Sequence, residues 1–444
     1  MTKSAVKIIG GGLAGCECAL QLLERGFAVE MYEMRPAMQT GAHRTSNLAE
    51  LVCSNSLKST EPTTASGLLK DELEIAGCRL LECAKESSVP SGSALSVDRE
   101  KFSKLVEERL FSYENFSLIR EEVRTLDDGV PTVIATGPLT SNSFAEVVGN
   151  LTGKDRLYFY DAVAPIVEFD SIDMTKAYFG GRYGKGGDDY LNLPMQREEY
   201  ERFYNELVNA KTVVLHDFEK SELFEGCMPI EEMAKRGSDT IRFGPLKPVG
   251  LRNPHTGEKA YAVVQLRKEN VAGDCYNLVG FQTNLTYGEQ KRVFSLIPAL
   301  HSAEFVRYGI MHRNTYINAP GVLDCTFRVK GERILYVAGQ LSGVEGYVES
   351  IMSGLIAGQA LAYELQGRQY CVPNNHTVIG SLCGYISTRS LDFKPMNANF
   401  GILPPITGIR DKSKRKLAYH DRGIEAMREW KENINIKETA NTEE

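Results

Sequence analysis

The chain has 444 residues, and 51 lysines and arginines against 58 aspartates and glutamates give it a formal net charge of −7. Apolar residues make up 42% of the sequence and charged residues 25%, which excludes a wholly disordered chain and a collagen-like one. The acidic balance excludes a uniformly basic protein that coats RNA or DNA, although it leaves room for a local basic patch. This length predicts two or three domains, each with its own core.

The apolar and cysteine patterns predict a cytoplasmic protein without membrane contact. No apolar run reaches the roughly 18 residues that a membrane-spanning helix needs. The apolar run behind Lys3 and Lys7 imitates a signal peptide, but glycines at 10–12 and 15 interrupt it. Ten cysteines in this length show neither the density nor the spacing of a secreted disulfide framework, and no CxxC pair indicates a zinc site. We therefore expect reduced thiols and no bound metal.

The first third of the chain predicts alternating strands and helices. Residues 5–9 are a β-branched run typical of a buried parallel strand, and residues 13–25 carry apolar side chains at helical spacing. A second strand follows at 27–33. Further helices are expected at 67–86 and at 98–110, with Asp98 as the N-cap of the latter, and a strand at 132–137.

The middle of the chain changes character. Residues 186–304 hold a Tyr- and Glu-rich helix at 198–210 and several Pro-Gly loops, without a repeat of the opening pattern. An apolar strand returns at 334–338, and a helix rich in small residues follows near 347–362. The pattern predicts one nucleotide-binding domain in two parts, interrupted by an inserted domain. The expected divisions are 1–185 and 305–400 for the nucleotide-binding domain, 186–304 for the insertion and 401–444 for a basic C-terminal segment and tail.

The turn after the first strand has the glycine pattern of a dinucleotide site. Gly10, Gly12 and Gly15 match GxGxxG, in which the glycines allow a tight turn, a close pyrophosphate and a helix packed on the sheet. A purely structural turn is the alternative. Here the motif joins a strand to a helix, and Glu33, 18 residues beyond Gly15, can accept hydrogen bonds from a ribose diol. The expected dinucleotide contacts are Gly10, Gly11, Gly12, Leu13, Ala14, Gly15 and Glu33.

A second glycine cluster lies near the far end of the chain. Gly339, Gly343 and Gly346 precede a helix that starts near Tyr347. The dipole of such a helix favours the electron-rich side of a reduced flavin at its N-terminus, whereas close helix packing is the alternative reason for small residues. This favours FAD over NAD, with Gly339, Gly346 and Tyr347 as further contacts.

These motifs, together with CSNSLKS (53–59), HRNTYINAP (312–320) and NANFGILPP (397–405), resemble the bacterial folate- and FAD-dependent tRNA (uracil-54-C5-)-methyltransferases of the TrmFO family, relatives of the GidA/MnmG enzymes. The resemblance covers nearly the whole chain. It implies an α/β fold, with a Rossmann-like FAD-binding domain of glutathione-reductase type interrupted by a smaller α+β domain. It also implies transfer of a carbon unit from methylenetetrahydrofolate to carbon 5 of uridine 54 in the tRNA T-loop, with FAD reduced by NADH or NADPH.

Two cysteines suit the chemistry of this reaction. Carbon 5 of uracil is a poor nucleophile until a thiolate adds to carbon 6, and a base must later remove the proton on carbon 5. Cys53 lies in a polar, turn-like stretch near Lys58, and Cys227 lies in a loop between a glycine and a proline. A small core residue is the alternative for any cysteine. The resemblance implies that Cys227 attacks carbon 6 and that Cys53 is the base or proton relay, with the division of roles open.

Folate is expected to contact the loop after the second strand. His43 is the candidate for stacking a pterin, or else an exposed loop histidine, and Arg44 can pair with a carboxylate or phosphate. No second GxGxxG exists for NAD(P)H. The glycine-rich loop at 179–187 is either a lid over a phosphate or a hinge between domains.

For RNA, the candidate is the basic segment at 410–416, with a solvated helix end as the alternative. Its cations are Arg410, Lys412, Lys414, Arg415 and Lys416. Aromatic residues of the inserted domain can stack a base extruded from the RNA. We expect tRNA as partner and no DNA, with the oligomeric state left open. The rival functions are the same chemistry on a ribosomal RNA uridine, a plain FAD-dependent oxidoreductase of a small molecule, and a flavoprotein partner subunit without chemistry of its own.

Overall fold

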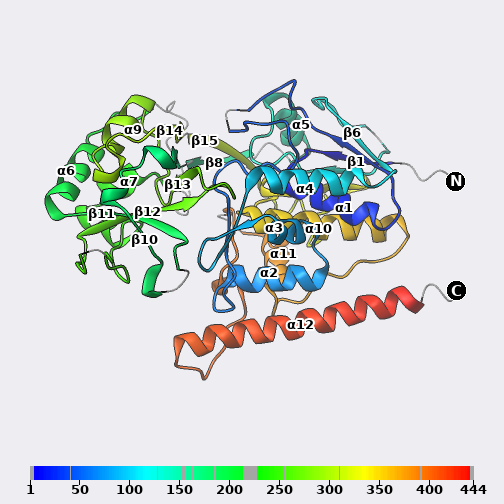
Figure 1. Cartoon of the computed structure of the whole chain (residues 1–444). Helices are drawn as coiled ribbons and strands as arrows, with labels where there is room; N and C mark the ends of the chain where they lie inside the picture. Colours follow the sequence, from blue (N-terminus) through cyan, green and yellow to red (C-terminus); the bar gives the residue numbers. More distant parts are fainter. Residues whose placement is uncertain are drawn as a thin grey trace.

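The structure, a computed structural model, describes residues 5–40, 42–127, 129–152, 156–162, 164–184, 187–213, 228–254, 256–309, 311–390 and 393–440. Figure 1 shows two regions side by side, a larger one that contains both the N-terminal strands and α10, and a smaller one from the middle of the chain. The long helix α12 lies along the base of the larger region (Figure 1). Each region has a core of its own.

A five-stranded parallel sheet lies at the centre of the larger region, in the order β16-β7-β1-β2-β6. Every residue of β1, β7 and β16 is buried, as expected for parallel strands enclosed by helices. β16 joins the sheet beside β7 although the whole inserted region separates the two in sequence. The bounds are β1 Val6–Ile9, β2 Val29–Tyr32, β6 Phe116–Ile119, β7 Thr132–Ile134 and β16 Leu335–Val337.

Helices α1 and α10 cross closely beside this sheet. A Cβ atom at Gly354 of α10 would lie 2.2 Å from the Ala14 carbonyl oxygen of α1, so only glycine permits this approach. The predicted helix at 67–86 is two helices, because Gly77 adopts a left-handed conformation with φ of 86° and ends the first. The helices are α1 Leu13–Leu23, α2 Ala65–Ala76, α3 Arg79–Glu86, α4 Arg99–Phe111, α5 Asn142–Thr152, α10 Tyr347–Leu365 and α11 Val378–Ser387.

The smaller region is built on a six-stranded antiparallel sheet in the order β10-β11-β12-β13-β9-β14. Its strands are β9 Ile166–Glu168, β10 Tyr178–Phe179, β11 Tyr190–Met195, β12 Ala262–Lys268, β13 Cys275–Leu278 and β14 Phe305–Arg307, and its helices are α6 Arg197–Val208, α7 Ile230–Lys235, α8 Ser238–Phe243 and α9 Tyr287–Phe294. β9 and β10 precede residue 186, where the sequence places the start of the insertion. They are too short to produce a visible alternation of apolar and polar residues.

Two small sheets complete the described fold. β8 (Arg156–Ala162) and β15 (Met311–Ile317) pair antiparallel and carry the chain between the two regions. A three-stranded sheet holds β3 (Ser56–Ser59), β5 (Ala94–Val97) and β4 (Ser88–Val89). Within the described ranges, no helix is both long and apolar enough to span a bilayer.

Helix α12 (Lys412–Ala440) occupies most of what the sequence predicts as a basic segment and tail, and it lies against α2. His420 Nε2 is 2.9 Å from the Asp71 carboxylate, and a Cβ at Gly423 would lie 3.0 Å from Leu68. Further along, the Trp430 indole donates a hydrogen bond to the Cys371 carbonyl. These contacts hold the helix along the larger region and leave its first turn exposed at one end.

Candidate active site

The glycine-rich turn lies at the carboxyl end of β1, as the motif predicts. A Cβ at Gly10 would lie 2.4 Å from the Ala135 carbonyl oxygen, and one at Gly15 would lie 2.0 Å from the Gly10 carbonyl oxygen. A Cβ at Gly11 would meet side-chain atoms instead, at 2.4 Å from Leu48 and 3.0 Å from Glu33. Gly12, by contrast, has open space where its side chain would lie. Packing against backbone thus requires glycine at Gly10 and Gly15, whereas Gly12 leaves room beside the helix.

The first turn of α1 faces this room with backbone amides. Its N-cap is Gly12, no side chain caps it, and no acidic residue lies in its first turn. Leu13 and Ala14 are buried there, with Ala14 against α10. An uncapped helix N-terminus presents unpaired N–H groups and a partial positive charge, which suits a phosphate.

Glu33 lies at the end of β2, in the wall of the same pocket. One carboxylate oxygen accepts from the Gly11 amide at 3.0 Å, and the other accepts from the Arg35 Nε at 2.9 Å. Burial opposes the charge, but these bonds and the Arg35 guanidinium hold the pKa of Glu33 below its usual range. The carboxylate is therefore an ionised acceptor with lone pairs left for a further donor.

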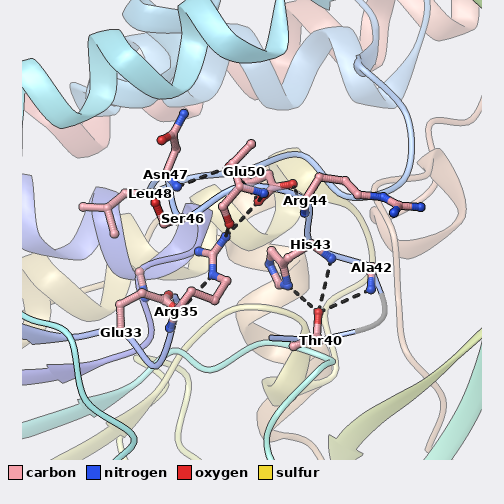
Figure 2. A network of polar contacts seen from close by, with 12 residues as sticks. Glu33, Arg35, Thr40, Ala42, His43, Arg44, Ser46, Asn47, Leu48 and Glu50 are labelled. Carbon is pink, nitrogen blue, oxygen red and sulfur yellow. Dashed lines mark hydrogen bonds and ion pairs between the residues drawn. The ribbon is translucent and has the colours of Figure 1, made fainter. Parts of the chain in front are cut away.

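His43 lines the pocket with the glycines and Glu33, on the loop that follows β2 (Figure 2). Its Nδ1 is 2.6 Å from the Thr40 hydroxyl, which also accepts from the His43 amide. Burial and the charge of Arg35 lower the pKa of His43 to about 4, so the ring is neutral at neutral pH. The neighbouring residue, Arg44, uses its amide to bind Glu50, while its side chain points away into a second cavity (Figure 2).

Cys53 is half-buried and lies beside the N-terminus of α10. Its amide donates to the phenol oxygen of Tyr347, the first residue of that helix, at 2.6 Å. The carbonyl of Cys53 accepts from Arg99 Nη2 at 3.0 Å, and that of Val52 accepts from Arg307 Nη2 at 2.6 Å. The cysteine loop is thus fixed by α4, by α10 and by the inserted region together.

The second glycine cluster shapes the start of α10. Gly339 has φ of 78° and donates its amide to Ser353 Oγ at 2.6 Å. Gly346 is the N-cap with φ of 117°, a conformation that an L side chain rarely adopts. Close by, Lys58 pairs with Glu349 at 3.0 Å and ties β3 to this helix.

The remaining predicted residues lie apart from the pocket or outside the described part of the chain. The basic segment runs into the start of α12, with residues 410–414 exposed and 415–416 partly buried, and Asp411 accepts from the Lys414 amide at 2.7 Å. Arg182 of the 179–187 loop donates to Gln265 at 2.9 Å within the inserted region. Cys227 lies outside the described residues. Among those that are described, no group of three His, Cys, Asp or Glu side chains could hold a metal ion.

Arg99, Arg307 and Glu349, the partner of Lys58, are the site residues that sequence reasoning missed. Arg99 and Arg307 bind carbonyls that are 46 and 255 residues away in sequence. The sequence around these arginines does not indicate this role, because any residue can supply the backbone carbonyl that each arginine binds.

Comparison with known proteins shows which protein family shares this fold. Residues 5–369 match the family model described as "Glucose inhibited division protein A". The solved structure of GidA from Aquifex aeolicus in its form I crystal is similar with a TM-score of 0.70 and 15% identity, over 97% of this chain and 76% of that chain. That likeness shows the fold, a Rossmann-type FAD-binding domain with an additional antiparallel sheet domain.

Two relatives carry the name methylenetetrahydrofolate–tRNA-(uracil-5-)-methyltransferase TrmFO. The protein from Syntrophomonas wolfei is 51% identical and covers 97% of this chain and 99% of its own length. The protein from Natranaerobius thermophilus is 54% identical over 95% of this chain and 98% of its own length. The resemblance inferred from the motifs is thereby confirmed, and the chain belongs to the TrmFO family.

Proposed function

We propose that this protein transfers the carbon unit of methylenetetrahydrofolate to carbon 5 of uridine 54 in tRNA and delivers it as a methyl group. The observation that carries the proposal is the place of Cys53, whose amide is 2.6 Å from the Tyr347 phenol at the N-terminus of α10. That helix end is where the glycine pattern assigns the flavin. A thiol at this end of α10 lies where the uracil of the RNA has to meet the flavin that reduces the transferred carbon.

The nucleotide turn fits FAD. The open space at Gly12 and the uncapped start of α1 suit the pyrophosphate, and the ionised Glu33 suits a ribose diol. Gly10, Gly11, Gly15, Leu13 and Ala14 form the turn around it, and Gly339, Gly346 and Tyr347 approach from α10. When bound, FAD supplies the electrons, drawn from NADH or NADPH, that convert the transferred carbon into a methyl group.

The chain's own residues supply binding and proton transfer. Arg99 and Arg307 hold the carbonyls on either side of the Cys53 amide, and their charges favour a thiolate at this position. In the proposed division of roles, Cys227 adds to carbon 6 of uracil, which makes carbon 5 nucleophilic. Carbon 5 then bonds to the methylene carbon of the folate. Cys53 takes the proton from carbon 5 as the bond between the methylene carbon and the folate nitrogen breaks. The Cys227 sulfur leaves carbon 6, and the ring double bond returns, when two electrons and a proton have reduced the methylene to a methyl group.

Folate and RNA bind at separate places in this proposal. The neutral ring of His43 stacks the pterin beside the nucleotide pocket, and Arg44 pairs with an anionic group of the same molecule. The exposed cations at the start of α12 bind RNA phosphates. These cations lie at the N-terminus of α12, where the helix dipole disfavours positive charge. A bound phosphate would offset this unfavourable interaction.

Nucleoside analysis tests the reaction directly. The purified flavoprotein is incubated with methylenetetrahydrofolate, NADPH and an unmodified tRNA transcript, and the RNA is digested for mass spectrometry. We expect 5-methyluridine in this transcript and none in a matched transcript with cytidine at position 54. Methylation of a ribosomal RNA fragment instead, or rapid NADPH turnover on a small molecule without RNA, would favour the rival functions.

A tRNA with 5-fluorouridine at the target separates the roles of the two cysteines. Fluorine on carbon 5 cannot leave as a proton, so a live nucleophile should be trapped as a covalent protein–RNA species. We expect Cys227→Ala to form no adduct and Cys53→Ala to retain some, while both lose methylation and keep flavin. An adduct in Cys227→Ala but not in Cys53→Ala reverses the roles, and normal methylation by both variants refutes the thiol mechanism.

A further inference from the structure

A second cavity, with a volume of about 690 Å³, lies between the FAD-binding region and the inserted region. Its wall includes Arg44 from the loop after β2, Arg99 from α4 and Arg307 from β14. The volume is within the range of small-molecule sites, roughly 300–1,000 Å³. His43 lines the nucleotide pocket and Arg44 lines this cavity, so consecutive residues of one loop separate the two spaces.

Two guanidinium groups in this wall have binding capacity to spare. Arg307 is 8% exposed, and its Nε is buried without a hydrogen-bond partner among the described residues. A buried donor without an acceptor is destabilising, which a ligand's acceptor would relieve. The Arg44 side chain points away from Glu50 (Figure 2), is exposed to solvent and lines the cavity. Burial and the charges of Arg99 and Arg44 lower the pKa of Arg307, as expected for cations facing one space.

The carboxylates in the wall are for the most part engaged with the protein's own groups. Glu269 pairs with Arg99 at 2.7 Å, and Glu50 pairs with Arg35 at 2.9 Å. Asp98 caps α4, and Asp274 accepts from Asn270 at 2.6 Å. Glu100, on the exposed first turn of α4, is the remaining acid of the lining. The charges left for a ligand are therefore chiefly those of Arg44 and Arg307.

From this geometry we infer that the cavity binds the carboxylates of the folate's glutamate tail, with Arg44 and Arg307 as its ligands. The inference rests on the proposed function, which puts the pterin beside His43. The p-aminobenzoyl group carries the glutamate tail away from the pterin, and the consecutive residues His43 and Arg44 line the two spaces that pterin and tail would occupy. An RNA backbone is a poorer fit, because Arg307 is buried. Each further glutamate adds a carboxylate, so polyglutamylated folates bind more tightly than the monoglutamate.

The test compares ligands with and without the tail on the flavin-loaded protein. Affinities are measured by calorimetry for tetrahydrofolate triglutamate, tetrahydrofolate monoglutamate and 6-methyltetrahydropterin, which has no tail. We expect Arg44→Gln to weaken both folates on the order of tenfold, which is typical of removing one charged hydrogen-bonding partner. Affinity for the tail-less pterin should stay within about twofold. Arg197→Gln, an exposed arginine on α6, is the matched control and should change none of the three.

A second variant addresses Arg307 without removing its charge. Arg307→Lys keeps a cation in the wall, but one ammonium cannot span both the Val52 carbonyl and a ligand as the guanidinium does. We expect affinity to fall several-fold for the triglutamate and less for the tail-less pterin, with flavin content as the check on folding.

The outcomes separate this inference from the proposed function. Two outcomes overturn this inference and leave the proposed function standing. In one, the wild-type protein binds folate tightly and with the same affinity whatever the length of the tail. In the other, Arg44→Gln lowers the affinity for tailed and tail-less ligands equally. A selective decrease in NADPH or tRNA affinity in that variant, with folate unchanged, also overturns it, because the cavity would then hold a phosphate. If the wild-type protein binds none of the three pterins, the proposed function fails and the inference fails with it.

Discussion

At the scale of single residues, Gly12 gives the sharpest test of the flavin site. Its missing side chain is not required by neighbouring protein atoms, since a Cβ there meets open space. Gly12→Val should therefore fold but fill the room for the pyrophosphate, and we expect a colourless protein by absorbance near 450 nm (on the order of tenfold less flavin). Gly288→Val on α9 is the matched control, because Gly288 also faces open space without a positive φ. Full flavin in Gly12→Val would contradict the assignment of this turn.

His43 makes stability depend on pH in a predictable direction. Its pKa is about 4 in the folded protein, against about 6.5 in an unfolded chain. Between these values the unfolded state binds a proton that the folded state does not, so stability is full above pH 6.5 and decreases as pH falls toward 4. The slope contributed by one such group is at most about 1.4 kcal/mol per pH unit.

Chemical denaturation at pH 7 and pH 5 measures this effect. We expect His43→Gln to lose less stability than the wild-type protein between these values, because glutamine does not titrate. His376→Gln removes an exposed histidine instead and serves as the control. An identical pH dependence in His43→Gln and wild type would show that the ring titrates freely in the folded state.

At the scale of elements, the start of α12 carries the expected RNA contacts. Changing Lys412, Lys414, Arg415 and Lys416 to glutamine should weaken tRNA binding and reduce the slope of log affinity against log salt by roughly 0.7–0.9 for each phosphate that is no longer neutralised. The control changes two exposed lysines of α4, Lys101 and Lys104, to glutamine. Filter binding between about 50 and 200 mM salt gives both slopes. An unchanged slope in the variant of α12 would favour the alternative interpretation, in which this segment is a solvated helix end that does not bind RNA.

Elements with strong local signals are predictable from sequence, and those defined by long-range packing are not. The turn at Gly10–Gly15 joins β1 to α1 as expected, and the Asp98 carboxylate accepts from the Lys101 amide to cap α4. Gly77 ends α2 through a left-handed conformation that a periodicity of apolar residues does not reveal. β9 pairs with β13, far along the chain, and β10, only two residues long, pairs with the next strand, β11.

At the scale of the whole molecule, a buried ion pair connects the two regions. Arg99 of α4 pairs with Glu269, which follows β12, and the same guanidinium holds the Leu51 and Cys53 carbonyls. Glu269→Gln should leave the partly buried Arg99 charge without its anionic partner and destabilise the protein by roughly 1–3 kcal/mol. Glu201→Gln, which breaks an exposed pair with Arg197, should leave stability almost unchanged.

Thermal unfolding and flavin release measure the effect of Glu269→Gln. We expect a lower midpoint and faster release of flavin, since the Cys53 loop and the start of α10 depend on the same arginine. Wild-type behaviour in both measurements would mean that the contact between the regions does not rely on this pair.

In the candidate site, as in the fold, local signals can be predicted from the sequence, and contacts made by long-range packing cannot. The sequence points to Cys53, Glu33 and His43, because their residue types have chemical meaning in the loops where they occur. Arg99 and Arg307 escape such reasoning, because their partners are backbone carbonyls brought close by the meeting of two regions. The cavity between those regions is likewise a product of their packing.

The place of β16 has a consequence for how the protein is made. The ribosome releases β1, β2, β6 and β7 early, but the strand that pairs with β7, and helix α10 that packs on α1, follow only after the entire inserted region. A nascent chain that ends near residue 330 thus holds a complete core for the insertion and an open edge on the parallel sheet. Exposed strand edges invite association with other chains. In the proposed site the flavin contacts Gly346 and Tyr347, so its capture would follow the synthesis of these residues, late in the life of each new molecule.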